Sequence, residues 1–152
     1  MNGFLLVNKE KGFSSNDIVQ RIKKNFLLKK VGHLGTLDPE AEGLLILAVN
    51  RATKFSHYFL NSDKSYFVRI KLGFVTDTDD ETGKVIKECD VSCTKNHIKR
   101  EIKNFLGESF QKPPFFSALK HKGKPLYFYA RKGEFIDKEP REGSILLIVN
   151  MP

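Results

Sequence analysis

The sequence predicts an α+β fold in which helices pack on a mixed, largely antiparallel sheet. Short apolar runs and alternating apolar and polar residues, both typical of strands, recur along the chain. Amphipathic segments that begin at serine or threonine lie between them and are typical of helices. The chain has 152 residues without repeats or low-complexity linkers, which is enough for one domain with a buried core. Strands and helices that alternate in this order form layers of helix on sheet.

The N-terminal half is predicted to contain two strands and two helices. Ser14 or Ser15 is suited to cap the first helix, which carries its apolar residues on one face and lysines on the other. The run 44–49 is wholly apolar and reads as a buried strand. The predicted elements are strands over residues 3–8 and 44–49, a helix to about Leu28 with Ile18, Val19, Ile22 and Phe26 on its apolar face, and a short helix over 52–60.

The C-terminal half is predicted to contain three strands and two helices. Side chains over 66–72 alternate in the way that places every second residue on one face of a strand. Thr94 is suited to cap a helix, and Pro125 fits the first turn of another. The predicted elements are a strand over 66–72 with a hairpin partner over 84–88, a helix with Ile98, Ile102, Phe105 and Leu106 on one face, a further helix from Pro125, and an apolar strand over 144–149.

Charge favours a polyanionic partner. The formal net charge is +8 and the isoelectric point is about 9.5, and nucleic acid is the commonest polyanion that such a surface meets. The cluster Lys23, Lys24, Lys29 and Lys30 is suited to phosphate contacts. No stretch approaches the roughly 20 apolar residues of a membrane span, and residues 1–7 read as a strand, not a signal peptide. We therefore expect a cytoplasmic protein without a membrane partner.

Two segments resemble metal sites only superficially. Cys89 and Cys93 precede His97, but zinc sites normally have four ligands and nothing nearby supplies the fourth. Free thiols are the better interpretation. The acidic segment 77–83 lacks the spacing and the closing glutamate of a calcium loop, so a solvated turn before a strand is expected. We expect no metal and no cofactor.

The most informative stretch is residues 32–45, GHLGTLDPEAEGLL, which places a single carboxylate, Asp38, in a constrained turn. Its glycines permit backbone angles that other residues avoid. Pro39 fixes its own φ and favours an extended conformation for Asp38. An acid in this setting is poorly explained as surface solubility. From these residues alone, a carboxylate that caps a turn or helix is the favoured alternative.

This stretch resembles the catalytic signature G-H-x-G-x-L-D-P-x-A-x-G-x-L of the TruB family of tRNA pseudouridine synthases, with every fixed position met. Further segments resemble family motifs in the same order, which is more specific than any one motif alone. Residue 10 departs from the pattern, since Glu10 stands where the family usually has proline. The further segments are 8–15 (K-P-x-G-x-S-S), 111–120 (Q-x-P-P-x-x-S-A-x-K) and 124–131 (K-x-L-Y-x-x-A-R). Residues 64–66, which are followed by Leu72 and Gly73, resemble the K-x-Y strand of the family, and residues 76–79 resemble its T-D-T-x-D loop.

The resemblance implies that the protein isomerises uridine 55 in the T-arm loop of tRNA. Asp38 would be the catalytic nucleophile that attacks C1′ of the target nucleotide or promotes glycal formation. His33 would contact the RNA and help to hold the loop from which the uridine is extruded. Tyr66 would stack on the flipped base, with a hydroxyl suited to assist proton removal from C5. From the residues alone, His33 bonded within a glycine-rich turn and Tyr66 in the core are the open alternatives.

Other residues of the matching motifs receive less specific predictions. Lys9, Lys64, Lys120 and Arg131 are predicted to bind RNA or to support the site, and a solvated charge is the alternative for each. Residues 113, 114 and 117 are predicted to shape the floor of the cleft.

The resemblance also makes a prediction about the extent of the domain. Family members continue with a G-x-Y-[IV]-R strand, whose arginine pairs with the catalytic carboxylate, and usually with a small RNA-binding domain. Residues 1–152 are therefore expected to form an incomplete catalytic domain, from a protein that is a monomer at full length. The alternatives are a catalytically inactive RNA-binding fragment and a general polyanion-binding domain, because loss of the arginine would remove a partner of the ionised aspartate.

Overall fold

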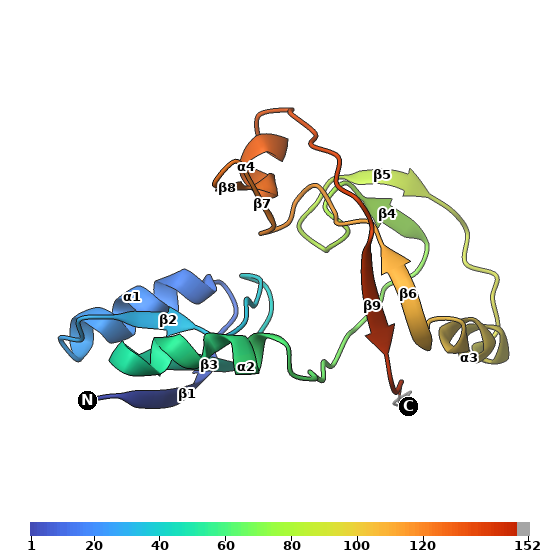
Figure 1. The fold of residues 1–152 in the computed structure, drawn as a ribbon. Coiled ribbons are helices and arrows are strands. Elements are labelled where there is room, and N and C mark those ends of the chain that lie inside the picture. Colours follow the sequence, from blue (N-terminus) through green and yellow to red (C-terminus); the bar gives the residue numbers. More distant parts are fainter. Residues whose placement is uncertain (149–152) are drawn as a thin grey trace. The chain divides into compact units, whose positions relative to one another are not determined.

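The computed structural model describes residues 1–148 and divides into two compact units, one from Met1 to Phe67 and one from Val68 to the end of the chain. Figure 1 traces both units in the order of the sequence. Every strand pair in the described residues is antiparallel, and helices accompany the strands in both units. The predicted α+β class with a largely antiparallel sheet is confirmed.

The first unit is built on a three-stranded sheet with β3 in the centre. The strand order is β1-β3-β2, in which β1 is Gly3–Lys9, β2 is Val31–His33 and β3 is Gly43–Val49. Leu47 of β3 faces Leu5 on one side and His33 on the other. The apolar run of β3 is explained by this central place, since both of its edges are hydrogen-bonded and both of its faces are covered.

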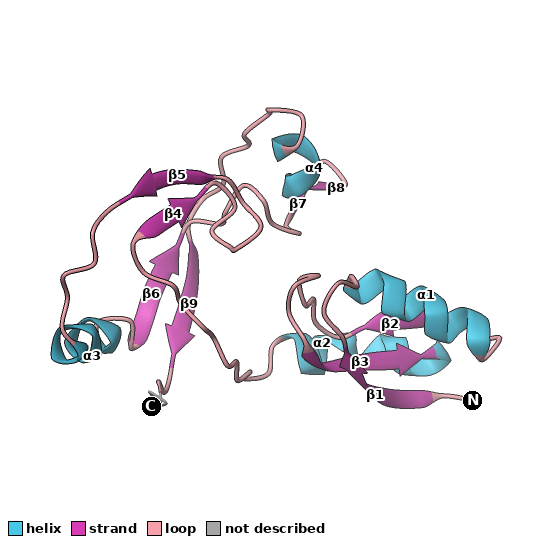
Figure 2. Cartoon of the chain, turned by 180° about the vertical axis from the view of Figure 1, so that it is seen from behind, coloured by secondary structure: helices cyan, strands magenta, loops and turns pink. Residues whose placement is uncertain are grey.

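Helices cover the two faces of this sheet with different residues of β3. Leu45 and Leu47 pack with Ile18 and Val19 of α1 (Ser15–Asn25). Alternation sends Ala48 to the opposite face, where it packs with Ala52 of the 3-10 helix η1 (Asn50–Phe55) and with Leu34. The short helix α2 (Ser56–Leu60) adds Phe59 to that second cluster. The two layers can be followed in Figures 1 and 2.

Helix α1 begins with a capping box. The Ser14 hydroxyl accepts a hydrogen bond from the backbone N–H of Asp17, and the Asp17 carboxylate accepts one from the backbone N–H of Ser14. The Ser14 hydroxyl also donates a hydrogen bond of 2.6 Å to the Asp17 carboxylate. This bond, followed by the one from the Ser14 backbone N–H, holds the pKa of Asp17 below its ordinary value. The helix ends at Asn25, earlier than the predicted Leu28, because Leu27 takes a φ of 51°. Phe26 is consequently exposed and does not extend the apolar face.

The second unit consists of two-stranded sheets with short helices. The strand pairs are β4–β5, β6–β9 and β7–β8. Among its described residues, Leu126 and Ala130 are the buried hydrophobic ones, and many apolar side chains are exposed. The bounds are Phe74–Thr76 for β4, Val85–Glu88 for β5, Lys95–Lys103 for α3, Gly107–Gln111 for β6, Lys120–His121 for β7, Lys124–Pro125 for β8, Leu126–Ala130 for α4 and Arg141–Ile145 for β9.

Four predicted elements of this region are wrong in place or extent. Helix α3 ends at Lys103, so Phe105 and Leu106 lie beyond it and are exposed. Residues 66–72 form no strand; β4 begins at Phe74 and pairs with the predicted partner β5. The strand predicted over 144–149 is β9 at 141–145, because its register with β6 ends at Ile145; Val149 lies outside the described residues. Pro125 precedes α4 as its N-cap residue and does not lie in the first turn. No helix within residues 1–148 has the length and apolar character needed to cross a membrane.

Candidate active site

The candidate site is the loop that joins β2 to β3 and carries Asp38. The loop leaves β2 at His33 and enters β3 at Gly43, so both of its ends are fixed in one sheet. Gly35 and Gly43 have φ angles of 148° and 119°, a region that favours glycine. The carbonyl of Asp38 accepts a hydrogen bond of 3.1 Å from the N–H of Ala41, which closes a tight turn. The predicted constraint on this stretch is confirmed.

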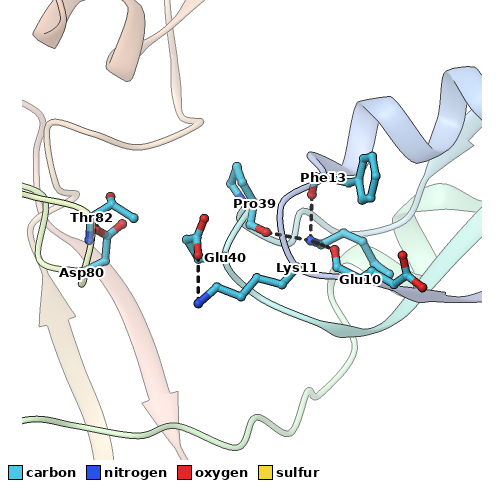
Figure 3. Close-up of polar contacts among 8 residues, drawn as sticks. Glu10, Lys11, Phe13, Pro39, Glu40, Asp80 and Thr82 are labelled. Atoms are coloured by element: carbon cyan, nitrogen blue, oxygen red, sulfur yellow. Dashed lines mark hydrogen bonds and ion pairs between the residues drawn. The ribbon is translucent and has the colours of Figure 1, made fainter.

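A buried lysine is hydrogen-bonded to the loop at the residue that follows Asp38. Lys9, the last residue of β1, is fully buried. Its ammonium group donates to the carbonyl oxygens of Phe13 at 2.7 Å, Glu10 at 3.0 Å and Pro39 at 3.2 Å. Figure 3 shows these contacts as dashed lines that converge on one nitrogen. The geometry supports the architectural role for Lys9, and direct contact with RNA stays a prediction.

The segment before α1 supplies further bonds to the same loop. The N–H of Gly12 donates to the Pro39 carbonyl at 2.8 Å. The Ser15 hydroxyl donates to the Leu37 carbonyl and accepts from the Leu37 N–H, both at 2.9 Å. Lys11 and Glu40 add an ion pair of 3.0 Å at the surface, drawn in Figure 3. The residues on both sides of Asp38 are thus hydrogen-bonded to residues 9–15.

The Asp38 side chain itself is exposed and unengaged. No hydrogen bond or ion pair joins its carboxylate to another residue of the described chain, and only its backbone carbonyl takes part in the turn. The carboxylate therefore caps neither a turn nor a helix here. The arrangement presents an acid to solvent on a backbone that is held on both sides, which suits attack on a bound ligand.

His33 contacts the loop locally. Its Nδ1 lies 2.7 Å from the carbonyl oxygen of Gly35, so this nitrogen carries the proton and donates it. The ring is half-buried at the end of β2. This is the local bond considered as the alternative for His33, and it fixes the orientation of the ring. Nε2 makes no hydrogen bond within residues 1–148, so it is the atom that is available for an RNA contact.

The remaining predicted residues lie after the sheet. The Lys64 ammonium donates to the carbonyls of Phe59 and Leu60 in the last turn of α2, which satisfies groups that a helix end leaves unpaired. It also donates to the carbonyl of Ser62, which follows the helix. Tyr66 lies in irregular structure and is 66% exposed, so it is not a core residue. Its ring and hydroxyl make no aromatic contact or hydrogen bond in the described part of the chain.

Arg131 and Lys120 belong to the second unit. The Arg131 guanidinium lies 5.2 Å from the centre of the Tyr127 ring, just after α4. Lys120 is exposed in β7. Of the predicted residues, the structure thus brings Lys9 and His33 to the Asp38 loop by hydrogen bonds, while Lys64 bonds the end of α2.

A hollow of about 400 Å³ lies in the second unit between β6, β9 and the segment that follows β6. Pro113, Pro114 and Ser117, the residues predicted to shape a cleft floor, contribute to its lining. The Ser117 hydroxyl is buried and has no hydrogen-bond partner among residues 1–148. These residues do line a concave surface; its part in a reaction stays a prediction.

The segments that resemble metal sites have other structures. Cys89 and Cys93 are exposed and free. The acidic segment is the turn between β4 and β5, in which Asp80 accepts hydrogen bonds from the hydroxyls of Thr78 and Thr82. Burial raises the pKa of Asp80, but these bonds and those from the backbone N–H groups of Thr82 and Gly83 outweigh it, so that pKa lies below its ordinary value. No group of three or more His, Cys, Asp or Glu side chains in the described chain is placed to hold a metal ion.

Comparison with known proteins agrees with this architecture and these motifs. Residues 23–150 match the family described as TruB family pseudouridylate synthase (N terminal domain). The tRNA pseudouridine synthase B of Blochmanniella floridana is 51% identical over 93% of the chain and 55% of its own length. The enzyme of that name from Yersinia pestis (strain Pestoides F) is 48% identical over 93% of the chain and 44% of its own length. The chain thus spans about half the length of the curated relatives it matches.

Solved structures show the same fold. A structure described as "Crystal Structure of a Cbf5-Nop10-Gar1 Complex" aligns with 79% of the chain and 31% of its own, at a TM-score of 0.52 and 28% identity. Another, "Structure of H/ACA RNP bound to a substrate RNA containing 2'-deoxyuridine", aligns with 80% and 35%, at a TM-score of 0.51 and 25% identity. The fold and the matched motifs define the class of pseudouridine synthases. Within that class, the chain belongs to the TruB family, of which it contains the N-terminal domain.

One contributor to the site was not recognised from the sequence. The sequence places Ser15 in the K-P-x-G-x-S-S segment and offers it as a helix cap, but predicts no role for it in the site; in the structure Ser14 caps α1 and Ser15 bonds Leu37. The available signal was the pair of adjacent serines, since only one of them can occupy the capping position.

Proposed function

We propose that the full-length protein containing this chain converts uridine 55 in the T-arm loop of tRNA to pseudouridine, with Asp38 as the nucleophile. The observation that carries the proposal is the exposed Asp38 carboxylate on a loop whose backbone is bonded on both sides. It stands at the aspartate of the G-H-x-G-x-L-D-P signature. The family to which the chain belongs and the names of its relatives support the reaction class.

The proposed chemistry rearranges one nucleotide without net gain or loss of atoms. The C1′–N1 glycosidic bond breaks, the uracil turns within the site, and a C1′–C5 bond forms. The proton on C5 then leaves while N1 gains a proton. Attack of the Asp38 carboxylate on C1′ would hold the ribose as a covalent adduct during the turn, as the nucleophile of a retaining glycosidase does. Proton removal from the ribose to give a glycal is the second route open to the same carboxylate.

The target uridine has to leave the RNA stack before this chemistry. Extrusion costs a few kcal/mol, which stacking on a protein side chain offsets. Tyr66 is suited to this role because its ring is exposed. His33 is suited to contact RNA through Nε2, with Nδ1 bonded to Gly35. The net charge of +8 favours a polyanionic partner, and one structural relative is described as bound to a substrate RNA. We propose a cytoplasmic monomer.

The experiment is to incubate the full-length protein with unmodified tRNA and to map pseudouridine at nucleotide resolution. Modification at position 55 supports the proposal. Modification only at other positions would overturn the assignment of the substrate site, and no modification at all would overturn the assignment of activity.

A second candidate is that residues 1–152 alone bind RNA without turnover. The observation in its favour is that no cation pairs with Asp38 within residues 1–148; such a partner favours an ionised, well-placed carboxylate. We expect this polypeptide to bind tRNA and to modify it far more slowly than a full-length relative. Equal rates would show that these residues are sufficient for catalysis and would reject the second candidate.

A further inference from the structure

Ser15 makes contacts that its place in the helix does not require. It is the first residue of α1 and is 3% exposed. Capping of the helix is performed by Ser14, whose hydroxyl bonds the N–H of Asp17. The Ser15 hydroxyl turns instead to the loop 22 residues further along and bonds both the N–H and the C=O of Leu37. The two adjacent serines therefore serve different parts of the structure.

We propose that Ser15 is a positioning residue for the reaction, which holds the Asp38 carboxylate where it meets C1′ of the target uridine. The proposal rests on the proposed function of Asp38. A peptide group is planar, so the carbonyl of Leu37 and the N–H of Asp38 move as one unit. The Leu37 N–H belongs to the preceding peptide plane. One hydroxyl thus fixes the orientation of both peptide planes that lead into Asp38.

The other side of Asp38 is held independently. The Pro39 carbonyl accepts bonds from the N–H of Gly12 and the ammonium of Lys9, and the ring of Pro39 fixes its φ. These bonds act on the peptide after Pro39 and not on the peptide before Asp38. They do not replace Ser15, because no other hydrogen bond within residues 1–148 holds the peptide between Leu37 and Asp38. With both sides held, the side-chain torsions of Asp38 remain its main freedom.

The chemistry of the contact requires a hydroxyl. A serine hydroxyl donates one hydrogen bond and accepts others, so it satisfies both groups of Leu37 at once. Alanine removes both bonds and leaves the Leu37 N–H and C=O to find other partners. A shift of about 1 Å in a reacting group is able to cost about 100-fold in rate. The expected loss for Ser15→Ala is therefore about 10- to 100-fold in kcat.

The test compares Ser15→Ala with Ser14→Ala in the full-length protein. Both substitutions remove one hydroxyl at the start of α1. We expect Ser14→Ala to lower thermal stability by loss of the cap and to leave kcat within about threefold. We expect Ser15→Ala to lower kcat by about 10- to 100-fold with KM nearly unchanged, since the buried serine does not touch RNA. Amide exchange at Leu37 should accelerate in Ser15→Ala and not in Ser14→Ala.

A second pair of variants distinguishes a loss of kcat caused by the missing hydroxyl from one caused by faulty folding. Ser15→Thr and Ser15→Val have the same shape and differ in the hydroxyl alone, so threonine should retain more kcat than valine. Equal kcat for threonine and valine, or for the two alanine variants, would overturn the positioning role. Activity of Asp38→Asn would instead overturn the proposed function itself. An inactive Asp38→Asn beside a fully active Ser15→Ala would reject only the role of Ser15.

Discussion

The ammonium nitrogen of Lys9 lies 3.2 Å from the carbonyl oxygen of Pro39, the residue after the candidate nucleophile. This bond joins the end of β1 to the loop between β2 and β3 across 30 positions of sequence. Because Lys9 is fully buried and also bonds two carbonyls of the segment before α1, it ties three parts of the first unit together. A buried cation is tolerated only where such partners surround it.

Replacement of Lys9 by methionine should destabilise the first unit. Methionine fills a similar volume but leaves the carbonyls of Glu10, Phe13 and Pro39 without this donor. We expect a loss of about 2–4 kcal/mol in the free energy of unfolding, the range for breaking a buried polar network. Hydrogen exchange at the amides of β1 and β3 measures it. The exposed Lys54→Met is the control and should change stability by less than about 0.5 kcal/mol; similar values for the two variants would contradict the role of Lys9.

Replacement of Tyr66 by leucine should lower turnover without unfolding the protein. Stacking of a base on an aromatic side chain is worth about 1–3 kcal/mol, so we expect kcat/KM on tRNA to fall by about 10- to 100-fold. Tyr66→Phe separates stacking from proton transfer, since it retains the ring and loses the hydroxyl. Tyr58→Leu is a matched control, because Tyr58 has the same exposed fraction of 66% in the same unit. Equal activity of Tyr66→Leu and Tyr58→Leu would place the base elsewhere.

The turn between β4 and β5 should lose stability in acid. The pKa of Asp80 is lowered in the folded protein, where threonine hydroxyls and backbone N–H groups outweigh the effect of burial. A carboxylate with a lowered folded pKa stabilises the fold above its ordinary pKa of 3.8 and loses this contribution as pH falls through the folded pKa. Asp80→Ala should therefore accelerate amide exchange at Thr82 near neutral pH.

The pH dependence provides the check on this assignment. The difference in Thr82 protection between wild type and Asp80→Ala should shrink as the pH falls below about 4. Asp90→Ala removes another exposed carboxylate of the same unit and should leave Thr82 unchanged. A difference that stays constant down to the acid limit would mean that Asp80 acts by packing and not by charge.

The parts of the fold that the sequence predicted correctly are those with strong local signals. The apolar run 44–49 and the strand predicted over 3–8 correspond to β3 and β1, and the serine pair with an apolar face corresponds to α1. Local signals were less reliable at element ends. The left-handed φ of Leu27, which ends α1 before the apolar pattern does, leaves no mark in the periodicity.

The strand predicted over 66–72 fails for a different reason. Alternation shows that a segment is able to form a strand, but a strand exists only where a partner is hydrogen-bonded to it. No strand pairs with residues 66–72 in the described chain, and Val68 and Ile70 are exposed there. In the same way, the register with β6 and not hydrophobicity sets the bounds of β9.

The candidate site shows the same difference between local signals, which the sequence reveals, and contacts between distant residues, which it does not. The constrained turn around Asp38 was predicted because glycine and proline restrict the backbone locally, and the catalytic role of Asp38 was predicted from the resemblance to the family signature. The bonds from Lys9 and Ser15 join residues that are 22 to 30 positions apart, so no local pattern reveals them. The distinct tasks of Ser14 and Ser15 emerged only from the direction of their hydroxyl groups in the folded chain.

The most direct test of the central claim is the turnover of Asp38→Asn on unmodified tRNA, measured in the full-length protein beside Glu42→Gln. Asparagine retains the shape of the side chain and removes the nucleophilic oxygen, and Glu42 is an exposed carboxylate of the same loop. We predict that Asp38→Asn lowers kcat by at least about 1,000-fold, as loss of a nucleophile does, while tRNA affinity stays within a few fold because phosphate contacts supply most of it. Glu42→Gln should retain wild-type turnover. Formation of pseudouridine by Asp38→Asn at the rate of Glu42→Gln would contradict the assignment of Asp38 as the nucleophile.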